Sequence, residues 1–180
     1  MVSVEKKSEL VPVRKEVGSH RLSRPIFYWE VCIDPEAVLN HVTRDSNYRE
    51  HALENGGERY ILMEDDRGLF YRFFRSVVSE LWLKLGRMAK RMREGVEYSG
   101  DVVVMKLEVS RNHDDNMMFS LGGFIGDYVC SAILRSWYLR NGLNDEALKC
   151  GNDADAALSD VVAVVHYRKR AVRRPIDPLF

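Results

Sequence analysis

Apolar residues recur at helical spacing along much of the chain. In the clearest stretch, every third or fourth residue between Phe70 and Met92 is apolar, which predicts an amphipathic helix over about residues 65–94. The same spacing predicts helices over about 114–141 and about 153–174, and a short helix from Asn144 to about Cys150 precedes the last one. The chain is therefore expected to be mostly helical.

A further helix is expected from its start and stop signals. Asp34 can cap it, Pro35 suits the first helical position and Glu36 adds an acidic group to the first turn. The Asn55-Gly56-Gly57 run would end this helix, and Asp45-Ser46 could interrupt it.

Two segments have the composition of β-strands. Residues 26–33 (IFYWEVCI) are aromatic and β-branched on both faces, so each face should be covered. Residues 96–110 alternate between the two faces beyond a turn signal at Gly100-Asp101, which predicts a hairpin or a single long strand.

Together these elements predict an α+β, mostly α fold, with three to four main helices in a bundle and an inserted β hairpin or strand. The 180 residues are an ordinary size for one domain, which is expected over 25–174. Residues 1–24 are polar and carry no period, which predicts a flexible N-terminal arm. Residues 175–180 contain two prolines and predict a stiff, non-helical C-terminal arm with an apolar tip.

Within the 114–141 helix, small residues recur every four positions at Gly122, Gly126 and Cys130, a spacing that permits close approach of a neighbouring helix. Asp127 stands among apolar residues of the same helix. We expect it to reach a polar seam or an interface rather than a catalytic metal.

The formal net charge is zero, with 27 basic and 27 acidic residues, which argues against a uniformly basic nucleic-acid binder and against an acidic tail protein. Charge is nevertheless segregated, because the 65–94 and 153–174 helices both start acidic and end basic. Compensation of the helix macrodipole explains this polarity. Alternatively, the basic ends face a polyanion such as DNA, in a non-specific and salt-sensitive contact. The candidates are Lys90, Arg91, Arg93, Arg168, Lys169, Arg170, Arg173 and Arg174.

Cysteine usage and hydropathy indicate an intracellular origin. The three cysteines, Cys32, Cys130 and Cys150, form no CxxC or Cys/His spacing, which is typical of a reducing compartment. The N-terminus has no apolar core of a signal peptide, and the longest aliphatic run, Val161 to Val165, is too short to span a bilayer. No membrane partner is expected.

One short motif has the residue types of a metal centre. His113-Asp114-Asp115 resembles the His-Asp dyad of the HD-type metal-dependent phosphohydrolases, and further ligands would be His41 or His51 together with Asp160. An Asp at this strand-to-helix boundary is also what helix capping requires. No phosphate-binding loop and no nucleophile elbow occurs in the sequence, so no catalytic residue, cofactor or metal is assigned.

The long helices, the apolar arms and the β segment between two helices suggest surfaces that another chain completes. In the order of its elements the chain resembles the head–tail connector proteins of tailed bacteriophages, which are adaptor, tail-completion and neck-ring proteins. The resemblance implies a non-enzymatic protein that forms a homo-oligomeric ring in the virion after assembly in the host cytoplasm. It implies contacts with other virion structural proteins and non-specific passage of DNA. It also implies that the C-terminal arm docks on a neighbour through Pro175, Ile176, Pro178, Leu179 and Phe180. The alternatives are the HD-type phosphohydrolase and a helical protein-binding module.

Overall fold

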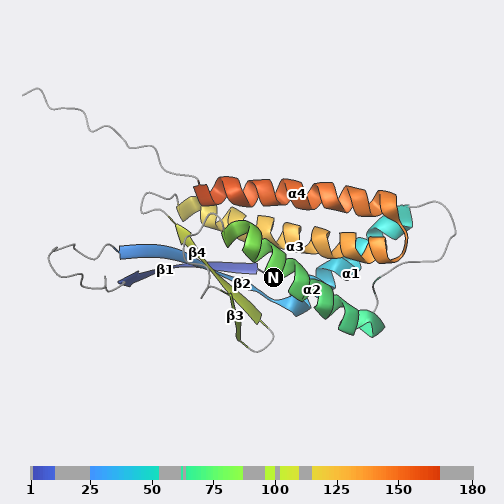
Figure 1. Cartoon of the computed structure of the whole chain (residues 1–180), viewed down its shortest axis with the longest axis horizontal. Coiled ribbons are helices and arrows are strands. Elements are labelled where there is room, and N and C mark those ends of the chain that lie inside the picture. Colours follow the sequence, from blue (N-terminus) through green and yellow to red (C-terminus); the bar gives the residue numbers. More distant parts are fainter. Residues whose placement is uncertain are drawn as a thin grey trace, which may run out of the picture.

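The structure is a computed structural model, and it describes residues 2–10, 25–52, 62, 64–86, 96–99, 102–109 and 115–166. Two strands followed by two helices occur twice along the chain, and two short 3-10 helices, Glu64–Asp66 and Asp115–Met117, precede the second and third α-helices (Figure 1). The main elements are β1 (Val2–Leu10), β2 (Pro25–Ile33), α1 (Pro35–Ala52), α2 (Arg67–Gly86), β3 (Val96–Ser99), β4 (Val102–Val109), α3 (Met118–Arg140) and α4 (Asn144–His166). The α+β, mostly α prediction is confirmed.

The four strands form one antiparallel sheet in the order β1-β2-β4-β3. On one face, Trp29 lies opposite Leu107 and Val31 lies opposite Met105, and all four side chains are buried. On the other face, Glu30 lies opposite Lys106 and is partly exposed. The predicted β segment over 96–110 is the β3–β4 hairpin.

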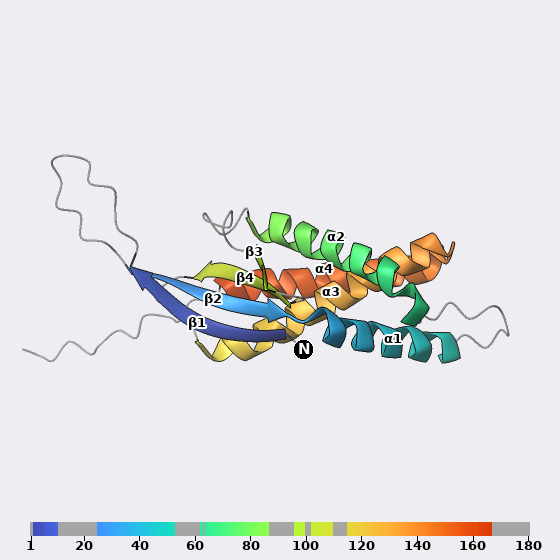
Figure 2. The same cartoon turned by 90° about the horizontal axis from the view of Figure 1, so that it is seen from below.

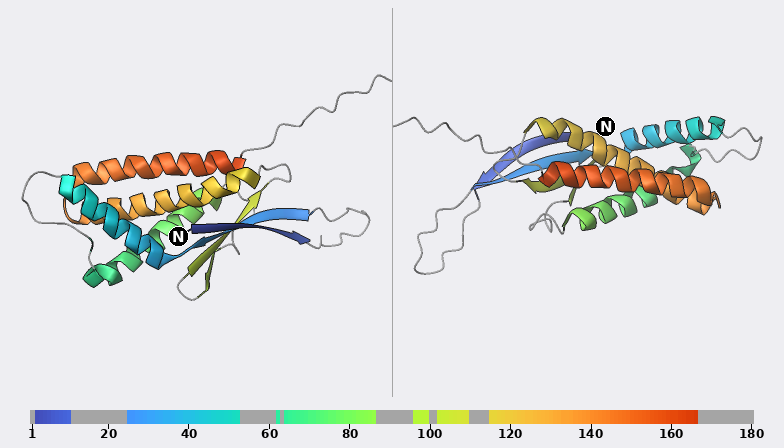
Figure 3. Two further views of the ribbon diagram at one scale, coloured as in Figure 1. Left: turned by 180° about the vertical axis from the view of Figure 1, so that it is seen from behind. Right: turned by 90° about the horizontal axis from the view of Figure 1, so that it is seen from above.

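The helices pack around α3, which lies at the centre of the molecule (Figures 2 and 3). The α4 helix contacts α3 along its length, whereas α1, α2 and β1 contact it over shorter stretches. The α3 side chains Leu121, Ile125, Val129 and Ile133 are fully buried. Because α1, α2, α4 and β1 all contact α3, the side chains on its surface determine how closely these elements pack.

The prediction of a flexible arm over residues 1–24 is wrong for residues 2–10, which form the edge strand β1. Val2 pairs with Ile33 and Val4 pairs with Val31, so β1 continues the sheet beside β2, and the partly buried Val2 packs against the core. The charged residues that follow Val4 in β1 suit an edge strand, because charge there resists pairing with other chains. Strand pairing across a long connection leaves no local period, which is why the polar sequence misled the prediction. Residues 11–24 lie outside the described residues.

The prediction of two helices between 144 and 174 is also wrong, because α4 runs without a break from Asn144 to His166. Gly151 does not interrupt it. A Cβ atom at this glycine would lie 3.5 Å from Cδ of Arg135 on α3. The small residues of α4 therefore allow close packing on α3, and this packing outweighs the weak helix propensity of one glycine. Residues 167–174 lie outside the described residues.

Helix α1 likewise passes through Asp45 and Ser46 without a pause. Ser46 is fully buried, and its hydroxyl donates a hydrogen bond to the carbonyl of Thr43 at 2.9 Å. At the start of α1 the expected cap is present, because the Asp34 carboxylate accepts a hydrogen bond from the backbone N–H of Glu36 at 3.0 Å.

Glu36 also ties α1 to α2. Its carboxylate accepts a hydrogen bond from the Arg67 guanidinium and another from the Tyr71 hydroxyl, the latter at 2.5 Å. These two donors lower the pKa of Glu36, first through the hydrogen bond with Arg67 and then through that with Tyr71. The network fixes the relative position of the two helix starts.

Candidate functional site

An open groove of about 350 Å³ lies between α1, α3 and the first residue of β1. Its lining is mostly apolar or backbone, and two side chains, His41 and Asp127, are polar. The lining residues are Val2, Ala37, Val38, His41, Phe119, Gly122, Gly123, Gly126, Asp127 and Cys130.

Missing side chains on α3 create this groove. Three of its lining positions are glycines, Gly122, Gly123 and Gly126. A Cβ atom at Gly123 would meet nothing within 4 Å, so this position opens onto free space. A Cβ atom at Gly126 would lie 3.7 Å from Cγ2 of Val2. The absent side chain at Gly123 therefore leaves space in the groove, while the absent side chain at Gly126 lets the end of β1 approach α3.

Phe119 lines the groove at the first turn of α3, and 85% of this residue is exposed. Three other large apolar residues are exposed within the described part of the chain: Leu83, Leu139 and Leu148. Phe119 has the highest exposure of the four. A phenyl ring in this position offers apolar area to a partner at the groove.

The polar groups of the groove do not form an activated nucleophile. Nε2 of His41 lies 3.5 Å from Oδ2 of Asp45, and both side chains are well exposed. Burial raises the pKa of the Cys130 thiol to about 12, and the nearby carboxylates of Asp45 and Asp127 add to this effect. At neutral pH the thiol stays protonated, whereas a nucleophilic cysteine needs the thiolate. The groove has the chemistry of a binding surface.

The residues predicted for a metal centre do not come together within the described residues. His41 lies at the groove on α1, whereas Asp160 lies on the exposed side of α4. His113 and Asp114 are outside the described residues, and only the backbone is described for His51 and Asp115. Among the described residues, no group of three or more His, Cys, Asp and Glu side chains is placed to hold a metal ion.

The other predicted site residues lie outside the described part of the chain. This holds for the DNA-facing candidates Lys90, Arg91, Arg93, Arg168, Lys169, Arg170, Arg173 and Arg174. It also holds for the arm-docking residues Pro175, Ile176, Pro178, Leu179 and Phe180. Asp127, expected at a seam or interface, is exposed and lines the groove.

Sequence reasoning missed the groove itself. The spacing of Gly122, Gly126 and Cys130 indicated close helix approach, but their neighbour at this point includes a strand end, since Val2 contacts Gly126. Finding the groove requires knowing that residues 2–10 join the sheet. In the local sequence, the feature that could have indicated the groove is Phe119, an aromatic residue close to the small residues of α3.

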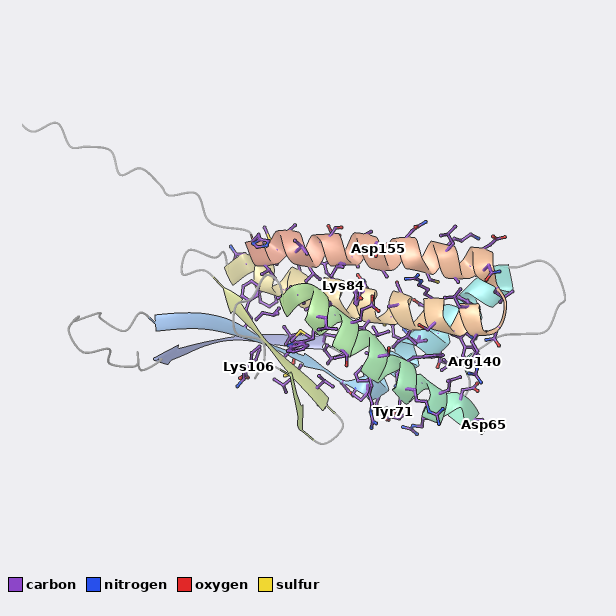
Figure 4. The ribbon with its side chains drawn as sticks, viewed as in Figure 1. Asp65, Tyr71, Lys84, Lys106, Arg140 and Asp155 are labelled. Carbon is purple, nitrogen blue, oxygen red and sulfur yellow. The ribbon has the colours of Figure 1, made fainter. Side chains whose placement is uncertain are left out.

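A second polar cluster lies where α2 meets α3. Nζ of Lys84 lies 2.8 Å from Oε1 of Glu80 and 5.4 Å from the ring centre of Tyr128. Burial disfavours the charge of Lys84, but hydrogen bonds with Glu80 and Tyr128 outweigh it and raise the Lys84 pKa. Burial also raises the pKa of Tyr128, chiefly by excluding water from its hydroxyl. Figure 4 shows Lys84 on α2 and Asp155 on α4, the two helices that flank α3. This cluster holds α2 in place.

The fold defined by these elements is a small antiparallel sheet joined to a bundle of four helices. The chain matches no protein-family model, no curated protein and no solved structure. Among the described helices, none combines the length and the hydropathy needed to cross a bilayer.

Proposed function

We propose that this chain is a non-enzymatic structural subunit of a bacteriophage neck or tail, where it assembles with further copies of itself into a ring. The groove beside Phe119 carries the proposal. A large apolar side chain that is 85% exposed at a mostly apolar groove is a surface that a protein partner covers. The order of strands and helices supports the connector class.

The proposed occupant of the groove is the C-terminal segment of a neighbouring copy, from Arg173 to Phe180. This segment has two basic residues followed by Pro-Ile-Asp-Pro-Leu-Phe. Its apolar side chains suit the lining of the groove, and its arginines suit the carboxylates of Asp127 and Asp45. Two prolines disfavour a helix here, and an extended segment suits a shallow groove.

The same proposal gives the basic residues a role. The sequence after α2 and after α4 is rich in Lys and Arg, and in a ring these stretches would meet the phosphates of DNA that passes through it. The contact would carry no sequence specificity and would weaken with salt. The protein would then be found in the virion, beside other structural proteins.

Light scattering of the full chain tests the proposal. The wild type should form a species of many subunits, whereas a chain that ends at Arg174 should fall toward the 20.8 kDa of one copy. Gly123→Trp should do the same, because a Cβ atom at position 123 meets nothing within 4 Å and the indole beyond it would occupy space in the groove. Gly123→Ala is the matched control and should keep the wild-type mass. A wild type that stays at 20.8 kDa would contradict the proposed self-assembly.

A further inference from the structure

The outer side of α2 is a basic surface with one apolar residue at its end. We call it the basic face, and it consists of Arg72, Arg75, Ser76, Ser79 and Leu83, all exposed. These residues lie opposite the buried stripe that contains Phe70, Phe74 and Leu81. Leu83 is 63% exposed. The helix as a whole carries four basic residues and one acidic residue.

The outer side of α4 has the opposite charge. We call it the acidic face, and it consists of Leu148, Asn152, Asp155, Ser159 and Asp160, all exposed. Leu148 is 66% exposed. The helix as a whole carries five acidic residues and one basic residue. Each face therefore combines charge of one sign with a single exposed leucine.

The charges on both faces form no ion pair within the described part of the chain. No ion pair joins Arg72 or Arg75 to another described residue, and none joins Asp155 or Asp160. By contrast, the other basic side chains of α2 form ion pairs, Arg67 with Glu36 and Lys84 with Glu80. The four charges without an ion pair thus all belong to exposed residues.

The two faces match in register when the helices run antiparallel. Leu83 follows Arg75 by eight residues, and Asp155 follows Leu148 by seven, which are separations of about 12 Å and about 10.5 Å along a helix. An antiparallel arrangement therefore places Leu83 on Leu148 at the same time as it places Arg75 near Asp155. A parallel arrangement would instead set Leu83 against a carboxylate.

Short side chains occupy the middle of both faces. Ser76 and Ser79 lie between the arginines and Leu83, and Asn152 lies between Leu148 and Asp155. The Ser79 hydroxyl already donates a hydrogen bond to the carbonyl of Arg75, at 2.7 Å. The two helices can approach closely without burying an unsatisfied hydroxyl at this serine.

We propose that the basic face of one copy docks antiparallel on the acidic face of a second copy, which deepens the proposed function by naming a contact between subunits. The contact joins two different surfaces of the same chain, so it is head-to-tail, the type of contact that forms a ring when the rotation between copies closes. Within one molecule the two faces cannot meet, because α2 and α4 both pack on α3 by their inner sides. The acidic face would repel a nucleic acid, whereas a second copy satisfies both faces at once.

Charge reversal on either face tests this contact. One variant carries Arg72→Glu and Arg75→Glu, and the other carries Asp155→Lys and Asp160→Lys. Each variant alone sets like charges against each other and should weaken association roughly 10- to 100-fold. An equimolar mixture of the two should recover association, with the two variants in equal amounts, because every contact in an alternating assembly again joins opposite charges. Circular dichroism of each variant is the control that checks whether it folds.

Leucine substitutions provide the matched control. Leu83→Glu should weaken association, whereas Leu139→Glu should not, because Leu139 is similarly exposed but lies on α3 outside both faces. The inference is overturned if both reversed variants keep the wild-type mass, or if their mixture associates no more than either variant alone. Where those variants keep the mass but Gly123→Trp loses it, the proposed function stands and this contact is wrong. A wild type that is monomeric throughout overturns both.

Discussion

Val2, the first residue of β1, lies directly against Gly126 on α3: a Cβ atom at position 126 would stand 3.7 Å from Cγ2 of Val2. This contact joins the edge of the sheet to the central helix and closes one end of the groove. The first strand is consequently part of the folded domain.

A large residue at position 126 should separate the strand from the helix. Gly126→Leu is expected to lower the free energy of unfolding by about 1–3 kcal/mol, since the added atoms would overpack the contact with Val2. Gly123→Leu on the same helix is the control. Its side chain enters open space, so it should keep or raise stability through better helix propensity. Urea unfolding of the two variants measures the difference, and equal losses in both would contradict the contact.

Deletion of residues 1–10 should destabilise the domain rather than trim an arm. Without β1 the backbone of β2 becomes the edge of the sheet, and Val31 and Ile33 keep their partners on β4 but lose those on β1. The melting temperature should fall by several degrees, since a loss of about 1 kcal/mol shifts Tm by roughly 2–8 °C in domains of this size range. Thermal unfolding followed by circular dichroism measures it. An unchanged Tm would mean that these residues do not stabilise the fold.

The continuity of α4 predicts opposite effects for two substitutions at Gly151. Gly151→Ala should raise stability by up to about 1 kcal/mol, because alanine favours the helix and its Cβ meets only the flexible side chain of Arg135 at 3.5 Å. Gly151→Leu should lower stability by about 1–3 kcal/mol, because the larger side chain would push α4 away from α3. Chemical denaturation gives both values. If alanine destabilised the protein, the helix would not be continuous at this residue.

Local patterns were enough to predict most of the helical part of the fold. The apolar stripe of α2 and the cap at Asp34 both predicted the helices that the structure contains. Patterns failed where distant segments decide the outcome. The polar strand β1 is held by Ile33 and Val31 of β2, and the helix at Gly151 is held by its packing on α3. The groove depends on the first of these contacts, because Val2 of β1 lines it, so its position could not be inferred, although the aspartate at 127 was expected at a polar seam or an interface.

Acid should loosen the junction of α1 and α2. Hydrogen bonds from Arg67 and then Tyr71 lower the Glu36 pKa in the folded protein, so the carboxylate adds stability above its unfolded pKa of about 4.5. That contribution is lost as the pH falls through the lower, folded value. Glu36→Gln should therefore be less stable than the wild type at pH 7, and the difference should shrink toward pH 3. Unfolding curves at several pH values measure it, and Asp65→Asn, an exposed acid next to the start of α2, is the control.

The cysteines should differ sharply in reactivity. Cys130 and Cys150 are buried, whereas Cys32 is partly exposed on the outward face of the sheet. An aromatic disulfide reagent at pH 8 should therefore label one thiol rapidly in the native protein and all three in denaturant. The pKa of Cys130, raised by burial to about 12, slows it further, because its thiolate fraction at pH 8 is very small.

Cys32→Ser removes the partly exposed thiol and leaves the two buried ones, so its labelling also tests the role of the groove. This variant should lose the rapid phase while its unfolding curve stays close to that of the wild type. A rapid phase that survives in it would show that one of the two buried thiols, Cys130 or Cys150, is accessible. If the label is then found on Cys130, the groove contains a reactive thiol and its role as a binding surface alone is contradicted. Above pH 9 the buried thiol should also make the protein less stable. The unfolded chain ionises there while the folded one does not, so stability is full below the unfolded pKa of about 9 and declines as the pH rises toward 12.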